Sequence, residues 1–421
     1  MMEEADRSPS RSPAGNWRFV VALLGARMHY AVPRILNEVG CLERLFTDSC
    51  AVKGLSQYLA LLPRCLQPAG IRRLLARVPT GIPASRITCL EWLGWQYALK
   101  RTRVAQSSEM TAVFLWANRA FGNLVCRNNW GEGNAVFTFN TAGLEILRLA
   151  RSRRYWAVME QTIAPRIVEE RLVAEERQAF PGWENEAQDR LLEACQKREE
   201  EEWQLADTIV CGSDFVKDRI GACGGPVDRC VTVPYGVDSP PASGPRQCHG
   251  GKLRVLMCGT VCLRKGVPYL VEAAKALKGR AEFRIVGPSA VAAEVSPEIE
   301  RHVALSGAVP RNQMAEHYQW ADVFVLPSIC EGSATVVYEA IGHGLPVVTT
   351  PNAGSVVRDG VEGFVVPIRD AAAIVQSLDR LLSDPQLRLE MSHRAYQRSL
   401  EFTVKRYQER LLQILTPQVS H

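Results

Sequence analysis

Two glutamates, Glu331 and Glu339, bracket the stretch EGSATVVYE, which lies between two short apolar runs. The run VFVLPS at residues 323–328 precedes it, and the run PVVTT at residues 346–350 follows it. This order predicts a strand, a sharp loop, a helix and a second strand, which together form one parallel α/β unit. Ligands of open α/β sheets bind at the carboxyl ends of the strands, beside helix N-termini. The two carboxylates would therefore face a site that suits hydroxyl groups and phosphates.

The predicted helix begins with an acidic residue, a glycine and a small hydroxyl residue. The backbone N–H groups of Gly332 and Ser333 would then be open to an anion, which the helix dipole favours by roughly 0.3–1 kcal/mol at exposed sites and up to ~2 kcal/mol when partly buried. Glu339 lies about two turns beyond Glu331, where a carboxylate can bind two vicinal ribose hydroxyls. The alternative is a helix N-terminal acid and a solvated helix glutamate without a ligand.

A second candidate site follows an earlier predicted strand, in the loop GTVCLRKG at residues 259–266. Gly259 allows a tight turn, and Arg264 and Lys265 place two positive charges at the carboxyl end of that strand. Two adjacent cations there suit a diphosphate, which an arginine can bind in bidentate fashion. The next predicted strand lies in the segment RIVGPS at residues 284–289 and is likewise ended by a glycine, Gly287. Taken alone, the Arg-Lys pair could equally be two ordinary surface cations.

Strands and helices alternate in both halves of the chain, which is typical of parallel α/β domains. The first half opens with a buried apolar run at residues 19–25, and a Pro-, Gly- and Ser-rich stretch at about residues 236–248 is the predicted interdomain linker. The length of 421 residues exceeds the roughly 250–300 residues at which one core stops growing. We therefore expect a disordered N-terminus at residues 1–15, an N-terminal domain at 16–240 and a C-terminal domain at 249–401.

The composition is that of an ordinary globular protein, with 47% hydrophobic and 23% charged residues. The net charge of +5 gives no case for binding nucleic acid. The 13 cysteines form no Cys-x-x-Cys pair, so we expect reduced thiols and no zinc site. No stretch approaches the ~18 apolar residues of a transmembrane helix, and the acidic N-terminus is unlike a signal peptide. These features predict a cytoplasmic protein.

Two regions are unusually rich in charge. Residues 53–110 combine arginines with leucines and aromatic side chains, and prolines break them into short helices. The part at residues 55–103 is either a basic, aromatic face that contacts an anionic membrane or a set of amphipathic helices with solvated arginines. Residues 165–204 form a long helical stretch with a run of glutamates at residues 199–202, which we interpret as a solvated helix face.

Together, and in this order, the motifs resemble the signature of the retaining glycosyltransferases of family four (glycosyltransferases group one), which have the GT-B fold. The residues that carry the resemblance are the two glutamates with seven residues between them and, earlier in the chain, Gly259, Arg264, Lys265, Gly266, Gly287, Gly307 and Arg311. The turn PYGVDSP resembles the Asn-Gly-Val-Asp turn of that family, with Tyr235 in place of asparagine. The resemblance is strong over about residues 205–370 and weak before residue 130.

The resemblance implies two Rossmann-like domains across a cleft, with the acceptor on the N-terminal domain and a nucleotide-diphosphate sugar on the C-terminal one. Arg264 and Lys265 would bind the diphosphate and stabilise its charge as it leaves. Glu339 would hold the ribose, and Glu331 would contact the sugar. The remaining donor-binding residues would be Gly259, Gly287, Arg311, Gly332, Ser333, Ala334 and Thr335. Members retain the anomeric configuration and generally need no metal or other cofactor. Their last helix, here residues 402–421, commonly packs back on the N-terminal domain.

The acceptor side departs from the family pattern. The first strand–helix loop, GARMHY, contains Gly25 alone, where many members have two glycines. Asn140 and Thr141 stand where many members have a histidine, and His29 is a candidate polar group. We predict a hexosyltransferase that acts on a glycan or lipid-linked acceptor of the cell envelope, with peripheral contact at the inner face of the membrane. The alternatives are a non-catalytic nucleotide-binding protein, an epimerase and a phosphorylase of the same fold.

Overall fold

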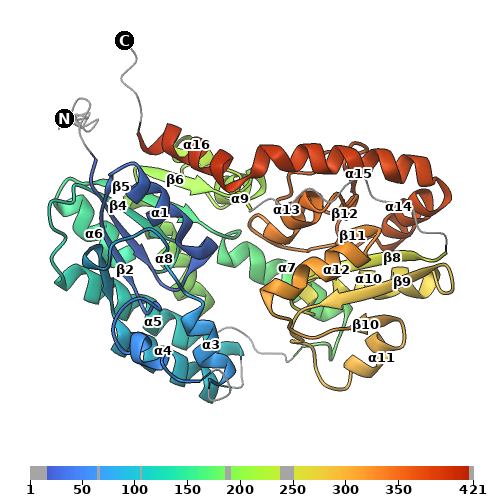
Figure 1. Ribbon diagram of the computed structural model, residues 1–421, viewed down its shortest axis with the longest axis horizontal. Helices are drawn as coiled ribbons and strands as arrows, with labels where there is room; N and C mark the ends of the chain where they lie inside the picture. The colour runs from blue at the N-terminus through green and yellow to red at the C-terminus, as the bar shows by residue number, and fades with distance from the viewer. Residues whose placement is uncertain (1–16, 64–66, 105–106, 185–190, 238–250, 417–421) are drawn as a thin grey trace, which may run out of the picture.

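The computed structural model describes residues 17–63, 67–104, 107–184, 191–237 and 251–416. These residues form two α/β domains that lie side by side (Figure 1). The N-terminus predicted to be disordered and most of the predicted linker lie outside the described residues. None of the helices that the structure describes is both long enough and apolar enough to cross a membrane.

The N-terminal domain is built on a seven-stranded parallel sheet with the order β3-β2-β1-β4-β5-β6-β7. Its strands are β1 (Phe19–Leu23), β2 (Leu42–Thr47), β3 (Ile87–Cys89), β4 (Ala135–Phe139), β5 (Trp156–Gln161), β6 (Thr208–Cys211) and β7 (Cys230–Thr232). The central strands β1 and β4 are buried along their whole length, which explains why their sequences are apolar except for Thr138 in β4. The predicted strand at the start of this domain is confirmed.

The helices of this domain are α1 (Ala31–Glu38), α2 (Leu55–Leu59), α3 (Ala69–Leu75), α4 (Glu91–Arg103), α5 (Ser107–Arg127), α6 (Leu144–Ser152), α7 (Arg166–Ala179), α8 (Leu192–Leu205) and α9 (Asp214–Ala222). The described residues of this domain also include the short 3-10 segments η1 (Arg27–Tyr30), η3 (Ala84–Arg86) and η4 (Val227–Arg229). The prediction of short helices in the basic region holds for α2 and α3. It is wrong for α4, which spans 13 residues because no proline interrupts it.

The C-terminal domain has a six-stranded parallel sheet with the order β10-β9-β8-β11-β12-β13. Its strands are β8 (Leu253–Cys258), β9 (Ala281–Val286), β10 (Val303–Leu305), β11 (Val323–Leu326), β12 (Val347–Thr349) and β13 (Gly363–Val365). Its helices are α10 (Val267–Ala276), α11 (Ser296–Glu300), α12 (Met314–Trp320), α13 (Thr335–Gly342), α14 (Ala371–Ser383) and α15 (Pro385–Ser399), with 3-10 segments η5 (Leu263–Lys265), η6 (Arg311–Gln313), η7 (Pro351–Ala353) and η8 (Leu400–Phe402).

The neighbouring strands β8 and β11 place the two candidate motifs together. The strand–loop–helix–strand unit predicted around Glu331 is confirmed as β11, α13 and β12, with Phe324 paired to Val347 in parallel register. β11 also pairs with β8, so the loop after each strand emerges at the same edge of the sheet. The loop with Arg264 and Lys265 therefore lies beside the loop with Glu331.

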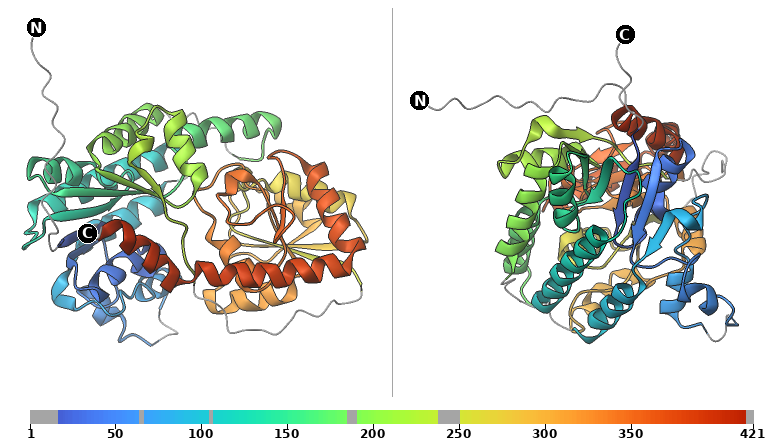
Figure 2. Two further views of the ribbon diagram at one scale, coloured as in Figure 1. Left: turned by 90° about the horizontal axis from the view of Figure 1, so that it is seen from above. Right: turned by 90° about the vertical axis from the view of Figure 1, so that its left-hand side faces the viewer.

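The chain returns to the N-terminal domain through α16 (Val404–Leu415). Figure 2 shows α15 running along the C-terminal domain and α16 continuing over the N-terminal one. Val237, at the start of the predicted linker, donates its N–H to the carbonyl of Phe402 at 2.9 Å. Arg410 of α16 donates to the carbonyl of Pro234 at 2.9 Å. The two segments that cross between the domains are thus bonded to each other.

The interpretation of residues 165–204 as a solvated helix face is wrong for three of its glutamates, whereas the side chains of Glu175 and Glu201 are exposed. Glu176 in α7 and Glu202 in α8 are fully buried, and Glu199 is only 2% exposed. The reason is tertiary: α7 extends along the C-terminal domain (Figures 1 and 2), while α8 packs against α6, α7 and β5. Both helices therefore turn carboxylates towards arginines and backbone N–H groups, which compensate for the loss of water.

Candidate active site

Three charged side chains meet where β8 and β11 end. Lys265 Nζ lies 2.6 Å from Glu331 Oε1, and Arg264 Nη1 lies 3.0 Å from the same oxygen. Arg264 also donates to the carbonyl of Cys330 at 2.9 Å. The side chains of Lys265 and Glu331 are 11% and 12% exposed, whereas Arg264 is 27% exposed. The structure thus unites the three residues predicted to carry the chemistry, with Arg264 as the more accessible cation.

Glycines shape the backbone around these cations. Gly259 has φ +137°, and a Cβ there would lie 3.2 Å from Cε of Lys265. A Cβ on Gly287 would lie 2.0 Å from the carbonyl oxygen of Gly259, so any side chain would push the two loops apart. Both predicted donor-site glycines therefore allow close backbone approach beside Lys265.

The loop after Glu331 differs in detail from the prediction. The helix α13 begins at Thr335, after Ala334, and not at Gly332 or Ser333. Ser333 instead shares a hydrogen bond of 2.7 Å with the hydroxyl of Tyr338, so its side chain is used in a tertiary contact and not as a cap. Within the described part of the chain, the backbone N–H groups of Gly332 and Ser333 have no hydrogen-bond acceptor. Their use by a bound anion stays a prediction.

Gly332 also lies at a contact between the two domains. A Cβ on Gly332 would lie 2.0 Å from the carbonyl oxygen of Thr162, in the loop between β5 and α7. The N–H of Ala164 in that loop donates to the carbonyl of Glu331 at 3.4 Å. The N-terminal domain therefore covers the loop predicted to bind the sugar and phosphate.

Glu339 is held in place by an aromatic side chain that sequence reasoning missed. The hydroxyl of Tyr318 in α12 donates to Glu339 Oε2 at 2.8 Å. Tyr318 is buried and stacks on His343, with ring centroids 4.9 Å apart. The sequence around Tyr318 does not predict this contact, because Tyr318 and Glu339 lie on different helices that the tertiary fold brings together. Glu339 is thus oriented by a buried neighbour, and the alternative of a freely solvated helix glutamate is excluded.

On the acceptor side, the first loop of the N-terminal domain reaches the C-terminal domain. His29 and Arg311, both predicted site residues, form a hydrogen bond across the two domains. Met28, His29 and Tyr30 all have positive φ angles, of 45°, 51° and 60°. Such conformations cost about 1–3 kcal/mol each in residues other than glycine and persist only where their surroundings hold them. Gly25 begins this loop with φ +100°.

A buried cluster anchors the strained loop. Arg27 Nε donates to Glu160 Oε1 at 2.9 Å, and the hydroxyl of Tyr235 donates to the same oxygen at 2.8 Å. Tyr235 and Glu160 are each 1% exposed. Tyr235, which stands where the family has asparagine, therefore connects the loop after β1 to the segment that leads into the interdomain linker.

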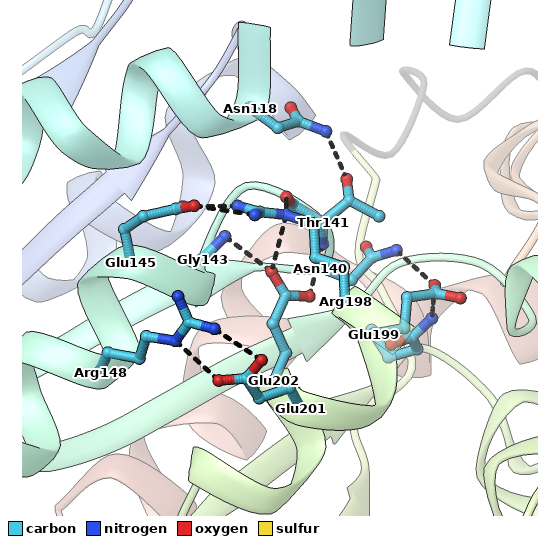
Figure 3. A network of polar contacts seen from close by, with 11 residues as sticks. Asn118, Asn140, Thr141, Gly143, Glu145, Arg148, Arg198, Glu199, Glu201 and Glu202 are labelled. Carbon is cyan, nitrogen blue, oxygen red and sulfur yellow. Dashed lines mark hydrogen bonds and ion pairs between the residues drawn. The ribbon is translucent and has the colours of Figure 1, made fainter. Parts of the chain in front are cut away.

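Asn140, the other acceptor-side candidate, belongs to a polar network at the end of β4 (Figure 3). Its Oδ1 accepts a hydrogen bond of 2.8 Å from the hydroxyl of Thr162, and its Nδ2 donates to Glu199 Oε1 at 3.4 Å. Glu202 accepts hydrogen bonds from the N–H groups of Thr141 at 2.6 Å and Gly143 at 3.0 Å. The network fixes the loop after β4 and ties it to the loop after β5.

The buried carboxyl of Glu202 predicts a pH dependence of stability. Burial raises its pKa to about 8, although Arg198 and the two N–H groups act in the opposite direction. An unfolded glutamate titrates near about 4.3, so the folded state binds this proton more tightly and stability falls as pH rises from about 4.5 to 8. We expect the free energy of unfolding, measured with urea, to drop by about 2 kcal/mol between pH 6 and pH 8. The drop should be absent in Glu202→Gln and present in Glu201→Gln, whose carboxylate is exposed. Parallel pH curves for the wild type and Glu202→Gln would contradict this assignment.

Sequence comparison bears on the C-terminal half of the site. Residues 252–384 match a family model described as "Glycosyl transferases group 1". The chain is 30% identical over 145 residues to the amylovoran biosynthesis glycosyltransferase AmsK of Erwinia amylovora, a match that covers 31% of this chain and 36% of AmsK. It is also 30% identical over 171 residues to an N,N'-diacetylbacillosaminyl-diphospho-undecaprenol alpha-1,3-N-acetylgalactosaminyltransferase of Campylobacter jejuni, covering 38% of this chain and 43% of that protein. The matches thus span less than half the length of these relatives.

Solved structures show the fold of the whole chain. Sucrose-phosphate synthase from Thermosynechococcus elongatus superposes with a TM-score of 0.64 at 17% identity, over 95% of this chain and 98% of that one. HepE of Anabaena, solved in complex with UDP and glucose, superposes with a TM-score of 0.60 at 13% identity, over 96% and 100% of the two chains. This protein therefore has the GT-B fold, with two Rossmann-like domains, as the sequence motifs predicted.

Proposed function

We propose that this protein is a retaining glycosyltransferase that moves a hexose from a nucleotide-diphosphate sugar to a glycan or lipid-linked acceptor. The observation that carries the proposal is the convergence of Arg264, Lys265 and Glu331 at the adjoining ends of β8 and β11. This charged centre lies inside the segment that matches the glycosyltransferase family model. A leaving diphosphate gains charge as the sugar bond breaks, and preorganised cations stabilise that charge in the transition state.

The surrounding residues have distinct roles in this proposal. The open N–H groups of Gly332 and Ser333 would bind a phosphate or a sugar hydroxyl beside the cations. Glu339, oriented by Tyr318, would accept hydrogen bonds from the ribose. Glu331 lies against both cations and would be next to the bond that breaks. His29 and Arg311 contact each other across the two domains and would form one boundary of the acceptor-binding part of the site.

The acceptor is proposed from the relatives. The names of AmsK and the Campylobacter enzyme describe amylovoran biosynthesis and a sugar transferred to a diphospho-undecaprenol-linked acceptor. We therefore place this protein in cell-envelope polysaccharide biosynthesis.

A transfer assay tests this proposal. Nucleotide sugars with a labelled hexose are incubated with the protein and an extracted fraction of lipid-linked saccharides. We expect label in the acceptor, and an anomeric NMR signal of the same configuration as in the donor. The opposite configuration would refute retention, and tight nucleotide binding without any transfer would favour the non-catalytic alternative.

We further propose that the N-terminal domain docks on an anionic lipid surface through α2, α3 and α4. This basic aromatic surface carries large apolar side chains in water, with Leu61 81% exposed and Trp92 75% exposed. Its exposed cations are Arg72, Arg73, Lys100, Arg101 and Arg103. The helices are neighbours, because α2 contacts α3 and the N–H of Leu55 in α2 donates to Glu91 at the start of α4 at 3.1 Å. Each cation near an anionic membrane contributes about 1 kcal/mol.

We expect the protein to sediment with vesicles that contain anionic phospholipid and to dissociate at high salt, because the attraction is partly electrostatic. The double variant Leu61→Glu/Trp92→Glu should reduce the bound fraction at least tenfold. Val227→Glu changes an exposed side chain of the same domain outside this surface and should bind like the wild type. Absence of vesicle binding at low salt would end this proposal.

A further inference from the structure

The segment at residues 166–184, here named the α7 arm, belongs to the N-terminal domain but is held against the C-terminal one by a hydrogen bond and an ion pair. The hydroxyl of Tyr269 donates to the buried carboxylate of Glu176 at 2.9 Å. Arg369 Nη2 lies 2.7 Å from Glu175 Oε2. Figures 1 and 2 both show α7 alongside the C-terminal domain. A movement of one domain against the other would therefore either carry the arm along with the C-terminal domain or break these contacts.

The docked α7 arm brings two carboxylates to the loop that carries the cations. Glu169 Oε1 lies 3.5 Å from Arg264 Nε, on a different edge of the guanidinium from Glu331. Near the other end of the arm, Glu184 accepts a hydrogen bond of 2.7 Å from the N–H of Leu263, the residue before Arg264. The arm thus holds Glu169 against the more accessible of the two cations.

Two carboxylates partly offset the charge of the cations before any diphosphate binds. Arg264 and Lys265 contribute two positive charges, and Glu331 and Glu169 contribute two negative ones, although Glu169 also pairs with Arg166 of its own helix at 2.9 Å. Glu331 belongs to the same domain as the cations and contacts both of them, so it stays with them however the domains move. Glu169 comes from the other domain and contacts Arg264 alone among these cations. A diphosphate that binds Arg264 must therefore compete with Glu169 or share the guanidinium with it.

We propose that Glu169 is a counter-charge, delivered by the α7 arm, that weakens the binding of a nucleoside diphosphate to Arg264. The docked arm then favours release of the diphosphate product, and withdrawal of the arm favours its capture. This inference rests on the proposed function of the donor site and adds to it a coupling between domain arrangement and diphosphate affinity.

Calorimetric titration with UDP, GDP and ADP tests the inference. Glu169→Gln and Glu169→Ala both remove the charge, and Ala also removes the side chain, so an effect common to both belongs to the charge. We expect either change to lower the Kd of the diphosphate that binds best by about tenfold. Glu170→Gln is the matched control, because Glu170 is adjacent on the same helix and shares Arg166 with Glu169, but its other ion pair is with Arg177 of the arm, where Glu169 pairs with Arg264. Its Kd should match that of the wild type.

The outcomes separate the inference from the proposed function. An unchanged or higher Kd in both Glu169 variants, with binding lost in Arg264→Ala/Lys265→Ala, overturns the counter-charge and leaves the donor site standing. An equal gain of affinity in Glu170→Gln also overturns it, because the effect would then belong to net charge. If neither the wild type nor the Glu169 variants bind any of the three diphosphates, the proposed function fails as well.

Discussion

The double variant Arg264→Ala/Lys265→Ala should transfer sugar about a thousandfold more slowly than the wild type. The loss of one group that stabilises developing charge typically lowers turnover about 10²–10³-fold, and this variant loses both cations next to the proposed leaving group. The measurement is kcat with a saturating nucleotide sugar.

This variant also leaves Glu331 largely buried without its two cationic partners, which destabilises the folded state. The melting temperature must therefore be measured in parallel. Lys275→Ala/Arg280→Ala is the matched control, because it removes two cations of the same domain that pair with exposed acids. Turnover within tenfold of the wild type, in a folded double variant of Arg264 and Lys265, would remove these residues from the mechanism.

The two glutamates of the EGSATVVYE stretch should separate in their kinetic effects. Glu331→Ala should lower kcat by about a hundredfold or more, because it releases the cations from the position in which they meet the leaving group. Glu339→Gln should mainly raise the KM for the donor, by about tenfold, because a ribose contact stabilises the bound donor and the transition state alike.

Tyr318→Phe provides an internal check on this division. It removes the hydroxyl that orients Glu339 and leaves the ring stacked on His343. The KM for the donor should rise in the same direction as in Glu339→Gln, by a smaller factor. If Glu339→Gln instead lowers kcat with an unchanged KM, Glu339 acts on the reacting bond and the division is wrong.

The parts of the fold that are local in sequence could be predicted. The buried strands on both sides of the Glu331 loop are continuous apolar runs, and glycines mark the turns that follow strands. Parallel strands place their following loops at one edge, which is why Arg264 and Glu331 were expected together and are found 3.0 Å apart. The exact start of α13 was not predictable. Serine is a common N-cap residue, but the hydroxyl of Ser333 forms a hydrogen bond with the hydroxyl of Tyr338, and the helix begins at Thr335.

The contacts between distant segments left no signal in the sequence. The sequence of a run of glutamates does not indicate whether water or protein surrounds the side chains. The partners of Glu202 are backbone N–H groups, which every residue except proline has, so they cannot be recognised in the sequence. The pairs Glu169–Arg264 and His29–Arg311 depend on how two separately folded domains meet. Periodicity predicts each domain, but it carries no information about the surface that each presents to the other.

A donor screen tests the central claim most directly. The protein is incubated with UDP-, GDP- and ADP-linked hexoses, and release of the nucleoside diphosphate is measured with and without the lipid-linked acceptor fraction. We predict release from donors of one base, stimulated by acceptor and lost in Arg264→Ala/Lys265→Ala. No release above background from any donor by the folded protein, or equal release by the double variant, would contradict the assignment of this site to glycosyl transfer.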